Sequence, residues 1–262
     1  MERVWGERPA EDALSWFYER NPVRPASVLI GEENGKTAGS VAMSFLRMSV
    51  SGDDLEVGMP VRLATDPGFQ GRGIFRELET ANEERARDLG IRLLLIVPNA
   101  TSARILTGAL GWRKLQSVRV WARPLLLRRP PTAAKVDRFD DALEDRSTGG
   151  DRVLRGGTWL NWRFADSPSR YELLAGGGYA IVGKQGRFGT IAALEGELLA
   201  DAGGVAEGRL LVAAPPPWLR RHYLRAGYLP THRVFAVLGK SLDPGLQLPP
   251  APHFELGDLD FL

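Results

Sequence analysis

The sequence contains no cysteine, only three histidines and only five lysines among its 34 basic residues. Without cysteine, disulfides, zinc–thiolate sites, iron–sulfur clusters and thiol nucleophiles are all excluded. The histidines (His222, His232 and His253) have no i, i+4 pairing and no acidic cluster beside them, so we expect no metal site.

Long apolar runs are also missing, because the longest aliphatic run, Leu93–Val97, is far shorter than a membrane span. The first residues are charged and lack the apolar segment of a secretion signal. We therefore expect a cytoplasmic protein with no membrane partner.

A strong excess of one charge is absent as well, since 34 basic residues face 32 acidic ones for a net charge of +2. This balance argues against nucleic acid as a partner. The 262 residues, of which 44% are hydrophobic and 25% charged, predict a globular protein of one large or two small domains. The preference for arginine suits phosphate or carboxylate recognition, but codon bias explains it equally well.

The most informative segment is a strand, a glycine turn, a helix and a second strand. Residues 57–65 read as a strand that ends at Asp66-Pro67-Gly68, and residues 91–97 are apolar at nearly every position, as in a buried parallel strand. Between them, a helix is predicted over residues 74–89, with Gly90 as its stop. Its apolar positions are Ile74, Phe75, Leu78, Ala81, Ala86 and Leu89. The unit predicts a right-handed parallel crossover.

The turn Asp66–Phe75 leads from a strand into a helix N-terminus, where backbone amides make a site for phosphate or pyrophosphate. A Walker loop is excluded because Ile74-Phe75 stands where that motif has Lys-Ser or Lys-Thr. A dinucleotide-binding fingerprint is disfavoured because Arg76 replaces its third glycine and no acidic residue closes the next strand.

Gln70-x-x-Gly73 after this strand resembles the pyrophosphate-binding motif of the GCN5-related N-acetyltransferase (GNAT) superfamily, [Arg/Gln]-x-x-Gly-x-[Gly/Ala], although Phe75 stands at its last position. Asn99 after the second strand, a short helix and Gly111-Trp112 follow in the family's order. Thr107 stands where family enzymes often carry a tyrosine that protonates the leaving thiolate. The match spans about residues 10–122.

The chain also partly repeats itself. Trp16–Pro22 pairs with Trp162–Pro168, and Gly111-Trp112 pairs with Gly227-Tyr228. Nothing in the second half matches the glycine turn. The chain thus resembles the tandem members of the superfamily. The implied fold is α/β (α+β), with a mixed, mostly antiparallel central sheet and flanking helices, present twice with the second copy shortened.

The predicted domains are a catalytic acyl-CoA-binding domain (1–124), a proline- and arginine-rich linker (125–140), a degenerate copy (141–248) and a tail (249–262). The tail alternates apolar and acidic residues. We expect Phe254, Leu256 and Phe261 to dock it against a domain, although some tandem acetyltransferases place their C-terminus in the active site.

The resemblance implies acetyl-CoA as co-substrate, with pantetheine lying between two splayed strands. An amide near Leu63 or Ala64 would polarise the thioester carbonyl. Gln70 and Arg72 are the expected side-chain contacts of the phosphates. The predicted cofactor-binding residues are Leu63, Ala64, Thr65, Gln70, Gly71, Arg72, Gly73, Ile74, Phe75, Asn99 and Ser102.

Catalysis then needs a base for the amine proton. The candidates are Glu56 at the start of the strand, the tail carboxylates Glu255, Asp258 and Asp260, the chain terminus, and a water relay. Tyr223, four residues before Gly227, becomes a proton donor if the second half closes over the first, but a tyrosine on the inner face of a helix is more often part of a core.

Direct attack by an amine is favoured, because no cysteine or Gly-x-Ser-x-Gly motif offers a nucleophile. The predicted function is N-acetyl transfer to a primary amine of a small molecule or peptide. The alternative is a catalytically silent CoA-binding or sensor module, which Phe75 and Thr107 favour. Aminoacyl transfer from tRNA is disfavoured by the near-neutral charge.

Overall fold

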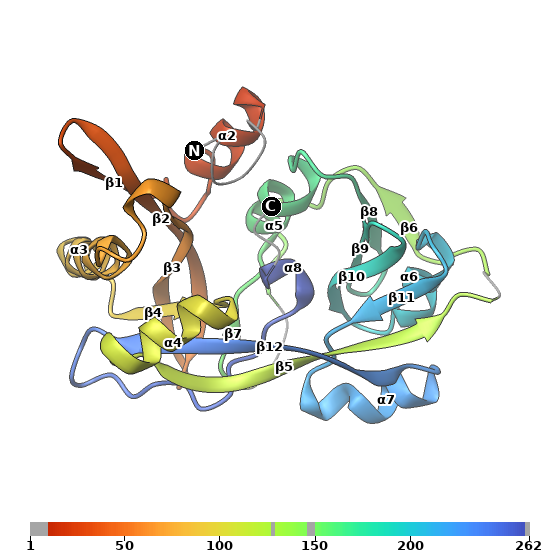
Figure 1. Cartoon of the computed structure of the whole chain (residues 1–262). Coiled ribbons are helices and arrows are strands. Elements are labelled where there is room, and N and C mark those ends of the chain that lie inside the picture. Colours follow the sequence, from red (N-terminus) through yellow and green to blue (C-terminus); the bar gives the residue numbers. More distant parts are fainter. Residues whose placement is uncertain (1–9, 127–128, 146–149, 260–262) are drawn as a thin grey trace. The chain divides into compact units, whose positions relative to one another are not determined.

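The computed structural model describes residues 10–126, 129–145 and 150–259, and these form two compact units (Figure 1). Unit 1 comprises Met1–Gln116 and Ala236–Pro252, and unit 2 comprises Ser117–Phe235 and His253–Leu262. Strands β5 (Arg113–Pro124) and β12 (Leu229–Ser241) each contribute one part to each unit. In the described part of the chain, no helix has the length and apolar character needed to cross a membrane.

Unit 1 is built on a sheet with the strand order β1, β2, β3, β4, β12. Neighbouring strands are antiparallel except β3 and β4, which are parallel as the sequence predicts. Besides the parts of β5 and β12, its elements are α2 (Glu11–Tyr18), β1 (Ser27–Glu33), β2 (Lys36–Val50), β3 (Asp53–Thr65), η1 (Pro67–Phe69), α3 (Ile74–Asp88), β4 (Leu93–Ile96) and α4 (Ala100–Ala109).

Helix α3 crosses from β3 to β4 and packs on the sheet (Figure 1). It approaches β2 closely at Gly39, where a Cβ would lie 2.6 Å from the Ala64 carbonyl oxygen and 2.9 Å from Leu78 Cδ1. The core of unit 1 joins buried side chains of α3 and α4 to those of β2, β4 and β12. The predicted helix 74–89 and the strands around it are confirmed.

The buried face of α3 differs from the predicted one. Ala81 is exposed, whereas Glu79, Asn82 and Glu83 are buried with Leu78 and Ala86. Glu83 can be buried because Trp112 Nε1 donates to its Oε1 at 3.0 Å, and Lys240 Nζ lies 2.5 Å from its Oε2. These partners come from distant parts of the sequence, so the local pattern of α3 does not reveal them.

Unit 2 has the strand order β12, β5, β11, β10, β9, β8, β6. Strands β10 and β11 run parallel, whereas β11 with β5, β10 with β9, β9 with β8 and β8 with β6 are antiparallel. Besides parts of β5 and β12, its elements are β6 (Ala134–Val136), β7 (Arg152–Val153), α5 (Gly157–Leu160), η2 (Asn161–Ala165), β8 (Tyr171–Ala175), β9 (Tyr179–Gln185), β10 (Phe188–Glu195), α6 (Leu199–Val205), β11 (Leu210–Ala213), η3 (Pro217–Leu219), α7 (Arg220–Arg225) and α8 (Leu256–Leu259).

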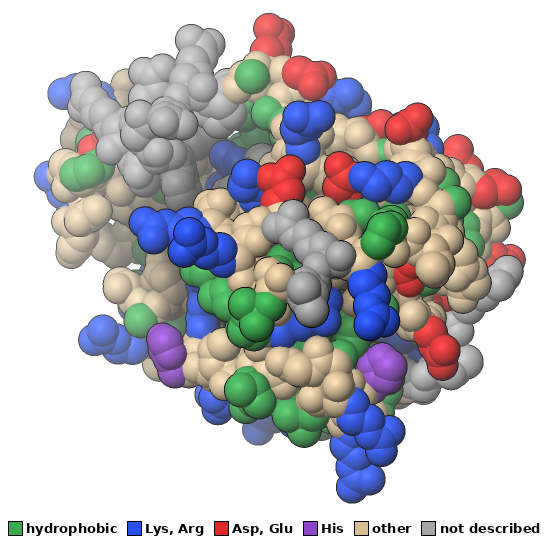
Figure 2. Space-filling view, turned by 90° about the vertical axis from the view of Figure 1, so that its right-hand side faces the viewer, with side chains coloured by type: hydrophobic (Ala, Val, Ile, Leu, Met, Phe, Trp, Pro, Cys, Tyr) green, Lys and Arg blue, Asp and Glu red, His purple; other side chains and the backbone are tan. Residues whose placement is uncertain are grey.

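The sheet is therefore mixed and mostly antiparallel with flanking helices, as predicted. The compact units differ from the predicted segments in two places. The predicted linker 125–140 contributes β6, which pairs with β8, and residues 236–248 belong to unit 1. Figure 2 shows basic and acidic side chains next to one another on the face that it presents. Exposed pairs of unit 2 such as Lys135–Glu172 and Lys184–Glu207 have this character.

Candidate functional site

The connection from β3 to α3 has the backbone of an anion-binding turn. Gly71 and Gly73 both have positive φ, 77° and 86°, and Gly73 is the N-cap of α3. Within the described ranges, the backbone N–H groups of Gly71, Gly73, Ile74 and Phe75 donate to no backbone carbonyl. Four free N–H groups at the positive end of a four-turn helix attract a phosphate group.

The side chains of Gln70 and Arg72 in the turn are both exposed. Arg72 Nη1 lies 3.2 Å from Glu33 Oε1, Arg72 Nη2 donates to the Gly68 carbonyl at 3.2 Å, and the guanidinium carbon lies 5.2 Å from the Phe69 ring centroid. An exposed ion pair of this kind contributes at most about 1 kcal/mol. Arg72 can therefore exchange Glu33 for a bound anion at little cost, and Gln70 is open to solvent.

Phe75, the departure from the family motif, packs against the core of unit 1. Ile74 also points toward the sheet, where its Cγ2 lies 3.2 Å from the position of a Cβ on Gly39. Both side chains thus leave the turn, and their backbone N–H groups remain at the helix N-terminus. The bulky residue at position 75 does not fill the turn.

Strand β3 carries a bulge just before this turn. Ser40 pairs with Ala64 and Ala42 pairs with Val61, so β3 has one extra residue around Arg62 and Leu63. Arg62 takes a positive φ of 50°, and its guanidinium carbon lies 5.1 Å from the Phe17 ring centroid. Bulges of this kind redirect backbone groups and are common beside active sites.

The parallel pairing of β3 and β4 is short. It joins Val57 to Leu93 and Gly58 to Leu94, after which β4 continues beside β12. We call residues 59–65 of β3, which extend past this pairing, the open segment of unit 1. It contains Leu63, Ala64 and Thr65, all half-buried, and Thr65 Oγ1 is buried without a hydrogen-bond partner. The family resemblance leads us to expect the pantetheine of acetyl-CoA beside this unpaired part of β3.

Asn99 and Ser102 lie at the N-terminus of α4. The Asn99 Oδ1 atom accepts from the Thr101 and Ser102 N–H groups at 3.0 and 2.9 Å, which makes Asn99 the N-cap of α4. The carboxamide oxygen is therefore engaged, and the exposed side chain has its NH₂ group left for a ligand. Thr107 is exposed, and its hydroxyl donates to the Ala103 carbonyl at 2.8 Å.

Glu56 lies far along β3 from the glycine turn. It lies on β3 before the parallel pairing, nine positions from Thr65, which corresponds to roughly 30 Å of strand. Its Oε1 lies 2.7 Å from Arg24 Nε. A role as base therefore requires Glu56 to leave Arg24, and its place as a catalytic residue stays a prediction.

Tyr223 is 3% exposed and belongs to the core of unit 2, where its ring meets that of Tyr228 edge-on at 5.0 Å. Burial, followed by the charges of Glu255 and Tyr228, raises the pKa of the Tyr223 hydroxyl. These contacts are those of a core residue. Its role as proton donor stays a prediction.

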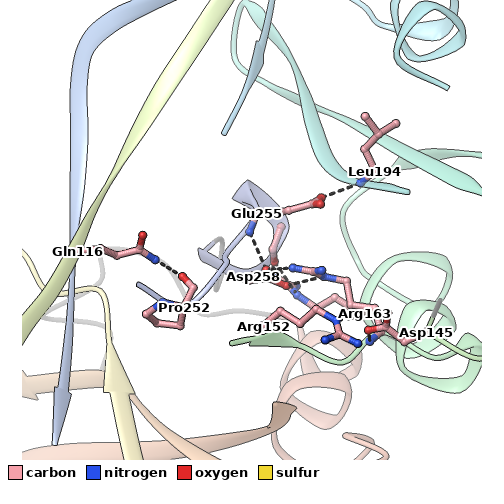
Figure 3. Close-up of polar contacts among 10 residues, drawn as sticks. Gln116, Asp145, Arg152, Arg163, Leu194, Pro252, Glu255 and Asp258 are labelled. Carbon is pink, nitrogen blue, oxygen red and sulfur yellow. Dashed lines mark hydrogen bonds and ion pairs between the residues drawn. The ribbon is translucent and has the colours of Figure 1, made fainter. Parts of the chain in front are cut away.

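The tail carboxylates Glu255 and Asp258 are both buried in unit 2 (Figure 3). Glu255 Oε2 accepts from the Leu194 N–H at 2.7 Å, and Arg155 Nε donates to Asp258 Oδ1 at 3.2 Å. Burial raises the pKa of Glu255 to about 7, while the Arg155 charge opposes the shift. Phe254 and Leu256 are buried, which confirms that they dock the tail. Asp260, Phe261 and the terminal carboxylate lie outside the described residues.

The Nε2 atom of His253, the histidine of the tail, lacks the hydrogen bonds that the carboxylates of Glu255 and Asp258 have. Burial, with the charges of Arg155 and Arg152, lowers the pKa of His253 to about 3, so its imidazole is neutral at physiological pH. Its Nε2 is buried without a hydrogen-bond partner. In the described ranges, no group of three or more histidine, aspartate or glutamate side chains is placed to hold a metal ion.

Arg62 and the bulge around it were not predicted from the sequence. One signal is present, because Pro60 interrupts the predicted strand, and proline within a strand marks an edge or a bulge. The burial of Glu79 and Asn82 has no comparable signal.

Residues 1–114 match the family model described as an acetyltransferase (GNAT) domain. No protein with a curated description matches the sequence. Three solved structures illustrate the likeness in fold. A probable N-acyltransferase from Enterococcus faecalis V583 is 12% identical with a TM-score of 0.66, covering 92% of this chain and 68% of that one.

Eis1 from Mycobacterium abscessus is 15% identical with a TM-score of 0.59, covering 92% of this chain and 69% of its own. A tandem GNAT protein from the clavulanic acid biosynthesis pathway is 13% identical with a TM-score of 0.55, covering 90% of this chain and 89% of its own. At these identities the likeness shows the fold alone, over about nine tenths of the chain. Residues 1–114 thus match a GNAT acetyltransferase domain, and most of the chain shares the fold of solved GNAT structures.

Proposed function

We propose that this protein is an N-acyltransferase that transfers an acetyl group from acetyl-CoA to a primary amine by direct attack in a ternary complex. The observation that carries the proposal is the turn at Gly71 and Gly73, whose N–H groups donate to no backbone carbonyl of the described chain and lie beside the bulged open segment of β3. The family fold supports a general N-acetyltransferase function.

The residues present fit acetyl-CoA as co-substrate. The N–H groups of Gly71, Gly73 and Ile74, with Gln70 and Arg72, would hold the pyrophosphate. Leu63, Ala64 and Thr65 on one side and Asn99 and Ser102 on the other would flank the pantetheine. The unpartnered Thr65 Oγ1 at the end of β3 supports this placement, because a buried hydroxyl ordinarily has a partner.

The reaction forms one bond and breaks one. The amine lone pair attacks the thioester carbon, the new C–N bond replaces the C–S bond, and the sulfur leaves with the electron pair. A backbone N–H of Leu63 or Ala64 at the bulge stabilises the charge that develops on the carbonyl oxygen. The amine loses one proton to a base and the thiolate takes up one.

The base and the acid are carried over from the sequence as Glu56 and Tyr223. Glu56 is paired with Arg24 and Tyr223 is buried, so we propose a water relay as the route for both protons. The acceptor is a small-molecule or peptide amine. The silent module is the weaker alternative, because Phe75, one of its two supports, packs against the core and leaves the turn open.

Calorimetric titration with acetyl-CoA tests the cofactor. We expect micromolar binding by the native chain and at least 100-fold weaker binding by Gly73→Glu, which places a carboxylate in the turn. Gly90→Glu is the matched control, because Gly90 lies at the other end of α3 with a similar φ of 77°, and a Cβ would meet no close contact at either glycine. It carries the same charge and strain and should bind like the native chain. Absence of binding by the native chain would refute the proposal.

Turnover is measured as release of free thiol during incubation with acetyl-CoA and a panel of amines. The chain contributes no background to a thiol reagent because it has no cysteine. An amine that accelerates thiol release in the native chain but not in Gly73→Glu identifies the acceptor class. Binding without turnover across small-molecule and peptide amines would favour the silent module.

A further inference from the structure

Strands β3 and β10 share two features, a short parallel pairing and a bulge. In unit 1, β3 is parallel to β4 only at Val57 and Gly58, and its bulge precedes Ala64. In unit 2, β10 is parallel to β11 at residues 188–190, and its register with β9 shifts between Ile191 and Ala193. Ala64 and Leu194 are comparable in position, since each follows the bulge of its strand and is the last residue but one of that strand.

The open segment of unit 2, residues 191–195 of β10, is covered by the tail. The Leu194 N–H donates to Glu255 Oε2 at 2.7 Å. A Cβ on Gly257 would lie 2.8 Å from the Ala192 carbonyl oxygen and 2.7 Å from Phe164 Cζ, so only glycine fits at this point of the tail. Ala192 and Ala193 at the bulge of β10 are 2% and 1% exposed, whereas Arg62 and Leu63 at the bulge of β3 are half-buried.

Besides apolar packing, contacts between charged and polar groups hold the tail in place (Figure 3). Arg155 forms a two-point ion pair with Asp258, in which both side chains are at least 97% buried. Arg163 Nη2 donates to the Gly257 carbonyl at 2.8 Å, and Asp258 Oδ2 accepts from the Glu255 N–H at 2.8 Å. Buried ion pairs need close, complementary geometry, and here they fix the order of groups along a peptide.

We propose that the open segment of unit 2 is a binding site for an acidic peptide, and that residues 253–259 of this chain are its resident ligand. The peptide presents one carboxylate to the Leu194 N–H, a glycine to the bulge and a second carboxylate to Arg155. Glu255, Gly257 and Asp258 supply these groups. The Glu255 carboxylate thereby accepts from a backbone N–H just after the bulge of β10. This inference rests on unit 2 alone and does not depend on acetyl-CoA binding.

A tethered ligand has a high effective concentration, on the order of millimolar for a short linker. A free peptide at micromolar concentration therefore cannot displace the native tail, but it can displace a weakened one. The probe is a fluorescently labelled peptide with the sequence of residues 250–262. The protein is the full chain, either native or carrying Glu255→Ala and Asp258→Ala.

Fluorescence anisotropy then gives the result. We expect the double variant to bind one equivalent of peptide at least 100-fold more tightly than the native chain. A control peptide with the same two substitutions should bind the variant at least tenfold more weakly than the native peptide. A folded double variant that does not bind the peptide, or that binds both peptides equally, overturns the proposal.

Hydrogen exchange of the Leu194 amide decides the question if the double variant does not fold. In the full chain, Glu255→Ala should accelerate this exchange at least tenfold relative to Ile181 on β9, and Glu255→Gln, which keeps an acceptor oxygen, should accelerate it less. Equal exchange at Leu194 in the native chain and Glu255→Ala overturns the proposal.

Discussion

The two units share an order of elements but differ where a ligand would lie. Residues 66–73 join β3 to the 15-residue helix α3 through two glycines of positive φ, whereas residues 196–198 join β10 to the seven-residue helix α6. Residues 61–63 of β3 are half-buried, whereas residues 191–193 of β10 are buried and the tail lies over them. In our proposals, one strand geometry serves an external ligand in unit 1 and a segment of the chain in unit 2, and the fold alone does not determine which.

The crossover helices make the comparison sharpest, because each buries an acid in a different environment. Glu79 on α3 is fully buried without a hydrogen-bond partner, and burial, with the charge of Glu83, raises its pKa to about 8. Asp201 on α6 accepts from the Ala133 N–H at 3.0 Å and from Thr132 Oγ1 at 2.9 Å, and these donors lower its pKa. The two helices therefore respond to pH in opposite directions.

The largest effect is expected for Glu79→Gln. A carboxyl whose pKa rises on folding stabilises the folded state below its unfolded pKa, near 4.5, and this contribution is lost as pH rises to about 8. At pH 9 the substitution should raise the free energy of unfolding of unit 1 by up to about 4–5 kcal/mol, with little change at pH 4. Native-state hydrogen exchange of α3 amides across this range provides the measurement.

The matched variant in unit 2 is Asp201→Asn. Because the pKa of Asp201 is lowered on folding, its contribution is present at neutral pH and is lost as pH falls through the folded-state value. We expect the variant to destabilise α6 at pH 7 and to have little effect at low pH. Parallel pH profiles for α3 and α6 in the native chain would contradict the comparison.

Next in size is the buried pair that anchors the tail. Arg155→Met leaves Asp258 buried without its cation and should destabilise unit 2 by about 3–5 kcal/mol. Arg138→Met is the control, because the Arg138–Asp166 pair is exposed and its loss should cost less than about 1 kcal/mol. Urea unfolding, monitored by hydrogen exchange of the β10 amides, distinguishes the two variants. Equal effects would mean that the tail is not held by this pair.

Local and distant interactions explain what could be predicted. The helix 74–89 and the strands before and after it are set by residues close in sequence, and they were predicted correctly. The sequence did not predict that β12 belongs partly to unit 1 and partly to unit 2. This division arises because β4 pairs with residues more than 140 positions away, such as Leu238 opposite Ile96. The burial of Glu83 depends in the same way on Lys240.

The candidate site shows the same limit. The positions of Gly71, Gly73 and Asn99 follow from motif and capping rules, whereas the pairing of Glu56 with Arg24 and the burial of Tyr223 depend on tertiary packing. Residue type and spacing therefore predicted the local geometry of the expected phosphate site. They could not determine which groups lie close enough to move a proton, because those distances are set by the packing of distant segments.

A smaller effect is expected for Asn99, whose capping of α4 can be separated from its predicted contact with pantetheine. Asn99→Ala should destabilise α4 by about 1 kcal/mol through loss of the cap, and Asn99→Ser should restore most of it because serine also caps helices. Neither variant has the carboxamide NH₂ group. If that group contacts the pantetheine, KM for acetyl-CoA should rise about tenfold in both. An unchanged KM in the serine variant would assign Asn99 to capping alone.

The smallest effect is expected for Glu56→Gln, which tests whether the paired end of β3 takes part in chemistry. Its carboxylate is paired with Arg24 and lies on the strand before the pairing with β4, far along β3 from the turn. We therefore expect kcat to fall less than threefold, with no change in its pH profile, and the free energy of unfolding to drop by up to about 1 kcal/mol. Arg24→Gln should have the same effect on stability, since it breaks the same pair. A 100-fold loss of kcat in Glu56→Gln, with disappearance of the acidic limb of the profile, would instead make Glu56 the general base and require β3 to act in catalysis along its whole length.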